Sequence, residues 1–262
     1  MTETPRIPTT AQRLAMRDRP PGPVVMHQQW RDLLFLHWRY PAAAIQATLP
    51  PGLFVDTHDG EAYLGVVPFT MQRVRPRFLP PVPGLSDFLE LNLRTYVHDA
   101  AGIPGVWFYS LDANQRLAVT IARTLFHLPY EHAVMQATRA LNGAMTFRSQ
   151  RHKHPGPHGA SCFSWAPSEA PRQANPGTLE YFLAERYRLY AHTPRGLRRG
   201  AVHHAPYPLC RATLTAWDDH LLPLNGFEST GRPPDHVLCS PGVDAAIFPL
   251  ERVPVAANPP AR

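Results

Sequence analysis

Lysine and cysteine are the scarcest reactive residues in this sequence. Lys153 is the single lysine among 26 basic residues, so amine chemistry has one candidate on the chain. The three cysteines, Cys162, Cys210 and Cys239, form no C-x-x-C pair, and their odd number argues against a disulfide scaffold. We therefore expect reduced, buried cysteines in a cytoplasmic protein.

Long apolar runs and the usual catalytic signatures are also missing. No stretch approaches the ~20 apolar residues that a membrane-spanning helix needs, and the first residues contain no apolar core of a secretory signal. The motifs G-x-S-x-G, G-x-G-x-x-G after a strand, the P-loop and H-E-x-x-H are absent. We expect no membrane segment, no leader and no cofactor.

The net charge of +6 raises the question of nucleic-acid binding. The arginines are dispersed along the chain, and the densest group, Arg195, Arg198 and Arg199, occupies a short predicted loop. No nucleic-acid-binding motif accompanies them. A solvated, arginine-rich surface explains the charge better, and we expect no specific nucleic-acid partner.

Proline is abundant and predicts a chain of short segments. The sequence has 31 prolines, which cannot donate to a sheet ladder or lie inside a helix. Residues 1–23 and 254–262 are rich in proline, arginine and small polar residues, and we expect loosely ordered tails there. Residues 24–253 then form a single domain.

Strand patterns outnumber helical ones. Residues 89–97 alternate strictly between apolar and polar positions, and residues 104–111 follow them across a turn, which predicts a hairpin. Helical spacing appears from an Asp112 N-cap to about Phe126 and again over residues 178–190. The pattern favours a mainly-β fold, an antiparallel barrel or sandwich with helical decoration.

The polar face of the 89–97 strand is the strongest candidate site. Glu90, Asn92 and Arg94 lie two residues apart, so their side chains project from one side of the strand. This side either faces water or, if the sheet closes, lines an interior that holds a polar or anionic ligand. The pattern alone leaves both alternatives open.

A histidine-rich stretch is the one candidate for a metal site. His152, His154 and His158 lie among prolines and glycines, which is typical of an exposed flexible loop. We favour the loop and expect no metal.

Seven segments together resemble the YqjF-like proteins, an uncharacterised bacterial family, between about residues 27 and 250. They are W-x-x-L-L-F-L-H-W (30–38), L-P-P-G-L (49–53), E-L-N-L-R-T-Y-V (90–97), P-G-V-W-F-Y-S-L-D-A (104–113), L-P-Y (128–130), E-R-Y-R-L-Y (185–190) and S-P-G-V-D (240–244). That family in turn is similar to acetoacetate decarboxylase over its first half. The resemblance implies a mainly-β (α+β) fold, a closed antiparallel β-barrel or cone with a few peripheral helices and a central pocket.

The resemblance also implies site residues, with one decisive departure. The pocket arginine and glutamate of the decarboxylase look similar to Arg31 and Glu90, while a second glutamate would fall near Gly65 and is missing. The decarboxylase has a lysine pair where this chain has Tyr130 and Glu131. Without an amine at that position, a Schiff base cannot form there.

These observations predict a small-molecule pocket. Glu90 and Arg31 are the candidate catalytic residues and are expected to share a charge-assisted hydrogen bond; the candidate ligand-binding residues are Arg94, Asn92, Tyr130 and His132. Two functions stay open: an enzyme that acts on a carbonyl or carboxylate compound without a Schiff-base lysine, or a non-catalytic protein that binds or sequesters a small molecule. The sequence indicates neither the substrate nor the oligomeric state.

Overall fold

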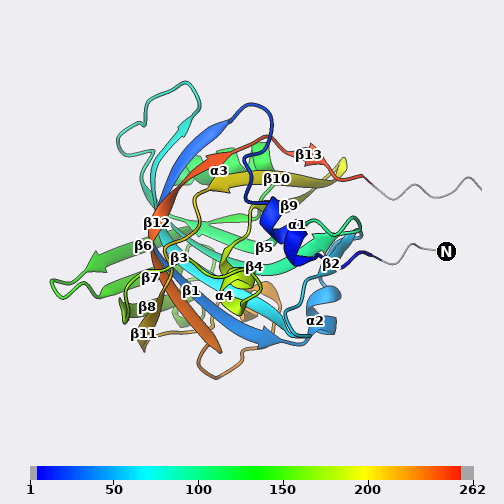
Figure 1. Cartoon of the computed structure of the whole chain (residues 1–262). Coiled ribbons are helices and arrows are strands. Elements are labelled where there is room, and N and C mark those ends of the chain that lie inside the picture. Colours follow the sequence, from blue (N-terminus) through cyan, green and yellow to red (C-terminus); the bar gives the residue numbers. More distant parts are fainter. Residues whose placement is uncertain (1–4, 255–262) are drawn as a thin grey trace, which may run out of the picture.

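The computed structural model describes residues 5–254, without the side chains of Ile121, Ala122, Leu125 and His158. The expectation for the C-terminal stretch therefore falls, apart from residue 254, outside the described residues. Within the described chain, strands dominate and helices are few (Figure 1), which confirms the mainly-β expectation. No helix in residues 5–254 is both long and apolar enough to cross a bilayer.

The strands of the described chain belong to one sheet. They are β1 (Met26–Tyr40), β2 (Leu53–Val55), β3 (Ala62–Pro76), β4 (Phe88–Asp99), β5 (Pro104–Ala113), β6 (Tyr130–Arg139), β7 (Met145–Arg151), β8 (Ala160–Pro167), β9 (Arg188–Thr193), β10 (Gly196–His204), β11 (Cys210–Ala216), β12 (His236–Ile247) and β13 (Glu251–Arg252). Their order is β13-β10-β9-β5-β6-β7-β8-β11-β12-β1-β3-β4-β2. Further pairings join β4 to β5 and β10 to β12, so the sheet returns upon itself.

The sheet is mixed rather than purely antiparallel, which corrects our expectation. Strand β5 pairs in parallel with β6 and with β9 and antiparallel with β4. The helix between β5 and β6 makes the first parallel pairing feasible, because parallel neighbours need a crossover connection. The predicted hairpin of β4 and β5 is present, with Glu90 opposite Ala113 and Arg94 opposite Phe108.

The helices are short and lie around the sheet. They are α1 (Thr10–Ala15), α2 (Ala42–Gln46), α3 (Arg116–Phe126) and α4 (Leu179–Ala184), with 3-10 turns at Pro157–Gly159 and Pro223–Asn225. Asp112 does not cap α3 as predicted: it belongs to β5 and forms a buried ion pair with Arg151, while Gln115 caps the helix. The helix predicted over residues 178–190 ends at Ala184, and its last part forms β9, where pairing with β5 and β10 overrides the local helical pattern.

A break in β1 decides which of its side chains face inward. The pairing of β1 with β3 shifts register between Arg31 and Leu36, and Asp32 has a positive φ of 55°. Before the break Trp30 lines the interior; after it Leu33 and Phe35 do. The inward phase therefore changes from even to odd positions, and Arg31 falls on the outer side.

Both faces of β4 are covered. Leu91 and Leu93 are fully buried in an apolar cluster on the outer side, which includes Phe147, Phe163 and Trp165 of β7 and β8. The opposite side faces the interior of the sheet ring, where a second apolar cluster surrounds a cavity. Water is thus excluded from the outer face, and the polar face turns to the inside.

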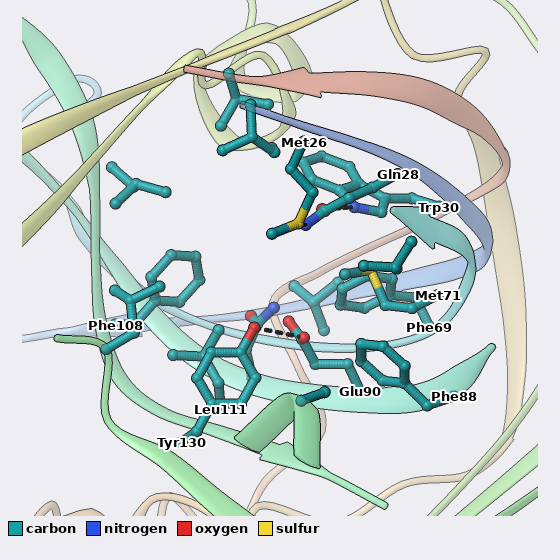
Figure 2. Close-up of a pocket in the computed structure, with 18 of the residues that line it drawn as sticks. Met26, Gln28, Trp30, Phe69, Met71, Phe88, Glu90, Phe108, Leu111 and Tyr130 are labelled. Atoms are coloured by element: carbon teal, nitrogen blue, oxygen red, sulfur yellow. Dashed lines mark hydrogen bonds between the residues drawn. The ribbon is translucent and has the colours of Figure 1, made fainter. Parts of the chain in front are cut away.

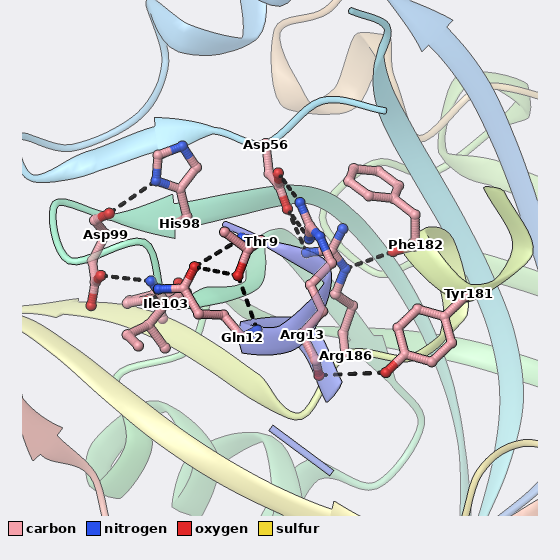
Figure 3. A network of polar contacts seen from close by, with 11 residues as sticks. Thr9, Gln12, Arg13, Asp56, His98, Asp99, Ile103, Tyr181, Phe182 and Arg186 are labelled. Atoms are coloured by element: carbon pink, nitrogen blue, oxygen red, sulfur yellow. Dashed lines mark hydrogen bonds and ion pairs between the residues drawn. The ribbon is translucent and has the colours of Figure 1, made fainter. Parts of the chain in front are cut away.

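The N-terminal segment is fastened to the domain by a buried carboxylate. Asp56 accepts hydrogen bonds from Arg13 of α1 at 2.6 Å and from Arg186 at 2.7 Å (Figure 3). The Asp56 side chain is 1% exposed, and Arg186 lies over the ring of Phe182. Residues 10–15, part of the stretch expected to be loosely ordered, are therefore helical and held by an ion pair.

We expect Asp56→Asn to lower the free energy of unfolding by roughly 3 kcal/mol, because the substitution leaves the buried Arg186 guanidinium without its counter-charge. Burial alone would raise the pKa of Asp56, but Arg186 and Arg13 outweigh burial and lower the pKa. The contribution should therefore be complete above the ordinary pKa of an aspartate and disappear as the pH falls through the lowered value. Denaturant unfolding from pH 7 to pH 3 measures both effects.

Asp59→Asn is the matched control, because the Asp59 side chain is 89% exposed. Equal stability losses in the two variants would contradict the structural role of Asp56.

Candidate functional site

A cavity of about 320 Å³ lies inside the sheet ring. Its walls are mostly apolar and aromatic, and Figure 2 shows Met26, Gln28 and Trp30 on one side, opposite Glu90 and Tyr130. Phe69, Met71 and Phe88 lie on the right side of the cavity in this view, and Phe108 and Leu111 lie toward the left. An apolar cavity with a few polar groups is the usual form of a small-molecule site.

The polar face of β4 points into this cavity. Glu90, Asn92 and Arg94 all line it, with exposed fractions of 3%, 4% and 9%. Of the two alternatives that the sequence left open, the solvent-facing one is wrong. The sequence-predicted residues Glu90, Asn92, Arg94 and Tyr130 therefore share one cavity.

Glu90 is the most perturbed acid of the site. Burial raises the pKa of its carboxyl to about 7, although hydrogen bonds with Tyr130 and Asn92 act in the opposite direction. The Tyr130 hydroxyl donates to Oε2 of Glu90 at 2.8 Å (Figure 2). Burial, together with the Glu90 charge, raises the pKa of Tyr130 well above its ordinary value, so the phenol stays protonated. A carboxyl with a pKa near 7 can both donate and accept a proton at neutral pH.

Arg94 brings a positive charge to the same face. One of its Nη atoms donates to the backbone carbonyl of Leu183 at 3.1 Å, and its guanidinium lies near the rings of Phe35 and Tyr96. Nε of Arg94 and Oδ1 of Asn92 are buried without a hydrogen-bond partner among the described residues. Unpaired polar atoms beside a cavity are typical of a site completed by a polar ligand.

Gly65 provides the space that Arg94 occupies. It pairs with Arg94 across β3 and β4, and a Cβ at position 65 would lie 3.1 Å from the Tyr96 hydroxyl, 3.2 Å from the His37 ring and 3.5 Å from Cγ of Arg94. A glutamate side chain at this position would meet those groups. Glycine therefore stands at this position because Tyr96, His37 and Arg94 leave little room for a side chain.

Two predicted residues lie outside the cavity. Arg31 forms an ion pair with Asp244 at 2.5 Å and donates to the carbonyl of Val243 at 2.8 Å, so the expected hydrogen bond with Glu90 is absent. The reason is the break in β1, which places Arg31 on the outer side. His132 is not among the cavity residues, and its ring lies beside that of His152, with centroids 5.7 Å apart.

The cavity also contains polar residues that the sequence reasoning did not select. Arg186, Arg188 and Tyr207 line it, and Arg186 is 9% exposed. Both arginines belong to the E-R-Y-R-L-Y segment (185–190), which the sequence analysis identified only as a family motif. Two arginines at alternate positions directly after an apolar helical segment are a pattern from which an anion-binding site could have been predicted.

Lys153, His152 and His154 are not among the residues that line the cavity. Lys153 is 64% exposed and pairs with Glu131 at 3.1 Å. In the part of the chain that the structure describes, no three histidine, cysteine, aspartate or glutamate side chains are arranged to hold a metal ion. The charged side chains that line the cavity are therefore Glu90, Arg94, Arg186 and Arg188.

The raised pKa of Glu90 predicts a pH-dependent stability difference. Its pKa is about 7 in the folded protein and near 4.5 in the unfolded chain, so the stabilising contribution of the protonated form is complete below pH 4.5 and is lost as the pH rises through 7. Glu90→Gln should therefore gain about 3 kcal/mol relative to the native protein between pH 4.5 and pH 8. Denaturant unfolding of both proteins at several pH values measures the difference.

Tyr130→Phe provides the control, because it removes the hydrogen bond that lowers the pKa of Glu90 and should shift the transition to higher pH. A stability difference that does not change with pH would show that Glu90 stays ionised.

Comparisons with known proteins agree with this architecture. A family model described as "Uncharacterized conserved protein (COG2071)", DUF2071, matches residues 27–244. "Uncharacterized protein YqjF" of Bacillus subtilis (strain 168) is 42% identical over 196 residues, which cover 74% of this chain and 78% of that protein. This identity confirms the resemblance to the YqjF-like proteins.

Solved structures show the same fold at low sequence identity. The enduracididine biosynthesis enzyme MppR complexed with pyruvate matches with a TM-score of 0.63 and 14% identity over 88% of this chain and 91% of that one. An acetoacetate decarboxylase-like enzyme from Sphingomonas wittichii RW1 matches with a TM-score of 0.58 and 14% identity, covering 88% and 94%. Acetoacetate decarboxylase from Legionella pneumophila subsp. pneumophila str. Philadelphia 1 matches with a TM-score of 0.60 and 11% identity, covering 88% and 89%.

These likenesses establish an acetoacetate decarboxylase-like fold. Together with the match over residues 27–244 and the identity to YqjF, they place the sequence: the chain belongs to the DUF2071 family of uncharacterized conserved proteins.

Proposed function

We propose that this protein binds a small carbonyl or carboxylate compound in the cavity and transfers a proton to or from it through Glu90. The observation that carries the proposal is the buried row Glu90, Asn92 and Arg94 on one strand face inside apolar walls. We take the returning sheet as a closed barrel wall around this row. The same fold in MppR complexed with pyruvate and in acetoacetate decarboxylase supports an oxo acid as the compound.

Arg94 and Asn92 are assigned to the polar end of the ligand. An arginine binds a carboxylate or polarises a carbonyl through charge-assisted hydrogen bonds, which are strong where water is excluded. Protonated Glu90 then lies on the same strand face, two positions from Asn92, and supplies a proton to the carbon or oxygen that gains negative charge. The Tyr130 hydroxyl stabilises the carboxylate that Glu90 becomes.

The alternative is a protein that binds the same compound without converting it. The mostly apolar walls and the lack of a lysine in the cavity favour this alternative, because binding needs only the arginine and a fitting volume. The raised pKa of Glu90 favours the enzyme, since a proton donor works best when its pKa is near the working pH.

Ligand binding should depend on Arg94 and not on Arg31. We expect Arg94→Gln to weaken the binding of pyruvate or acetoacetate by about 10- to 100-fold, the usual worth of a hydrogen bond to a charged group. Arg31→Gln is the matched control and should leave the affinity unchanged, because Arg31 lies outside the cavity. Isothermal titration calorimetry measures both, and native mass spectrometry of the purified protein shows whether a compound of this class co-purifies. Equal losses in the two variants would contradict the assignment of Arg94.

A measurement of proton transfer distinguishes the proposed enzyme from the alternative, a non-catalytic binding protein. In D₂O the native protein should accelerate hydrogen exchange at the methyl group of pyruvate, followed by NMR, and Glu90→Gln should lose at least about 100-fold of this rate, the low end of general acid–base catalysis. The Glu90→Gln variant should still bind pyruvate. Exchange at the buffer rate with intact binding would favour the non-catalytic alternative.

Schiff-base chemistry should be absent. Treatment with acetoacetate and borohydride is expected to leave the protein mass unchanged, since the resemblance places Tyr130 at the position of the decarboxylase lysine and Lys153 is exposed. A stable adduct that disappears in Lys153→Ala would overturn this expectation.

A further inference from the structure

The geometry points to a ligand with a straight aliphatic chain, a medium-chain carboxylate or oxo acid that enters the cavity with its polar head first. This inference rests on the proposed function and adds the class of compound. Its basis is the order of side chains along the cavity. That order separates a charged inner end from an apolar mouth.

The strand register gives the order. Across β3 and β4, Gly65 pairs with Arg94, Val67 with Asn92 and Phe69 with Glu90; Met71 then pairs with Phe88. Because a strand advances about 3.4 Å per residue, the row from Arg94 to Phe88 extends for about 20 Å. Because Arg94 and Phe88 both line the cavity, we take it as a slot along β4 with these residues at its two ends.

The inner end is closed and charged. Arg94 contacts the carbonyl of Leu183 there, and the cavity-lining residues Ala184 and Val106 are only 2% and 5% exposed. Among the described residues, the hydrogen-bond acceptors of Arg94 are the Leu183 carbonyl and the Tyr96 hydroxyl, and neither carries a charge. A carboxylate that reaches this end would supply the missing counter-charge.

The mouth is apolar. Val82, Leu85 and Leu117 line the cavity and are nevertheless 49%, 41% and 48% exposed, so the cavity opens between the 77–87 loop and the start of α3. Ser86 and Gln115 also line this part, but the Ser86 hydroxyl accepts from the amide of Val82 and the Gln115 amide donates to the carbonyl of Gly84. Here a short acid bound at Arg94 would leave the apolar outer part of the slot in contact with water.

A straight chain removes this apolar surface from water. Each methylene that enters the slot contributes about 0.8 kcal/mol, which corresponds to about fourfold in affinity. The volume of about 320 Å³ is at the small end for ligand cavities and has no room for a lipid with two chains. One chain of medium length matches both the length and the volume of the slot.

A chain-length series tests the inference. Isothermal titration calorimetry with straight-chain carboxylates from butyrate to dodecanoate should show the affinity rise about fourfold per methylene and then level off when the chain reaches the mouth. Arg94→Gln should weaken every member of the series by a similar factor, because each binds by the same head.

Variants at the mouth sharpen the test. Leu85→Asp places a charge beside the outer part of the chain and should weaken decanoate at least tenfold while butyrate is unchanged. Leu85 is already partly exposed, so the fold should tolerate the substitution. Leu141→Asp, at a fully exposed site on the turn between β6 and β7, is the matched control and should affect neither acid.

The outcomes separate the inference from the proposed function. Arg94-dependent binding of pyruvate or butyrate without a rise along the series would overturn the aliphatic chain and leave the proposed function intact. An affinity that rises along the series but is unchanged by Leu85→Asp would overturn the head-first orientation. No Arg94-dependent binding by any acid would overturn both.

Discussion

Glu90 and Arg94 are ionisable side chains buried on one strand, and burial of a charge costs free energy that the surrounding structure has to offset. For Glu90 the offset is protonation, since its pKa rises to about 7, together with the hydrogen bond from Tyr130. For Arg94 it is the carbonyl of Leu183 and two aromatic rings. The two groups are not paired with each other, so each keeps its capacity to act on a ligand.

The inner end of the cavity is linked to the ion pairs that hold the N-terminal helix. Arg186 lines the cavity and at the same time donates to Asp56, which also holds Arg13 of α1 (Figure 3). Burial lowers the pKa of Arg186 to about 10, and Asp56 opposes this effect, so the guanidinium keeps its charge at neutral pH. The carboxylate thus fixes the position of a cavity residue and fastens the first helix with the same contact.

The sequence predicted the row on β4 because period-two geometry is a property of the strand itself. It could not show which face turns inward, since this depends on Phe147, Phe163 and Trp165, which cover the outer leucines from distant strands. Arg31 lies outside the cavity for a related reason. The left-handed backbone at Asp32 changes which side chains of β1 point into the cavity. No local sequence pattern predicts a break of this kind. The shortened helix α4 likewise follows from pairing partners far away in the chain.

Tyr130 places a neutral hydroxyl beside the carboxyl of Glu90, and this affects the pKa of Glu90. Its hydroxyl lies 2.8 Å from the Glu90 carboxyl, at the position where the resemblance to the decarboxylase expects an amine. A lysine there would place a positive charge beside Glu90 and lower the pKa of the carboxyl. The neutral phenol instead lets burial dominate, so that Glu90 holds its proton up to about neutral pH. On the resemblance to the decarboxylase, the residue that takes the place of the lysine is therefore also the one that leaves Glu90 beside a neutral group.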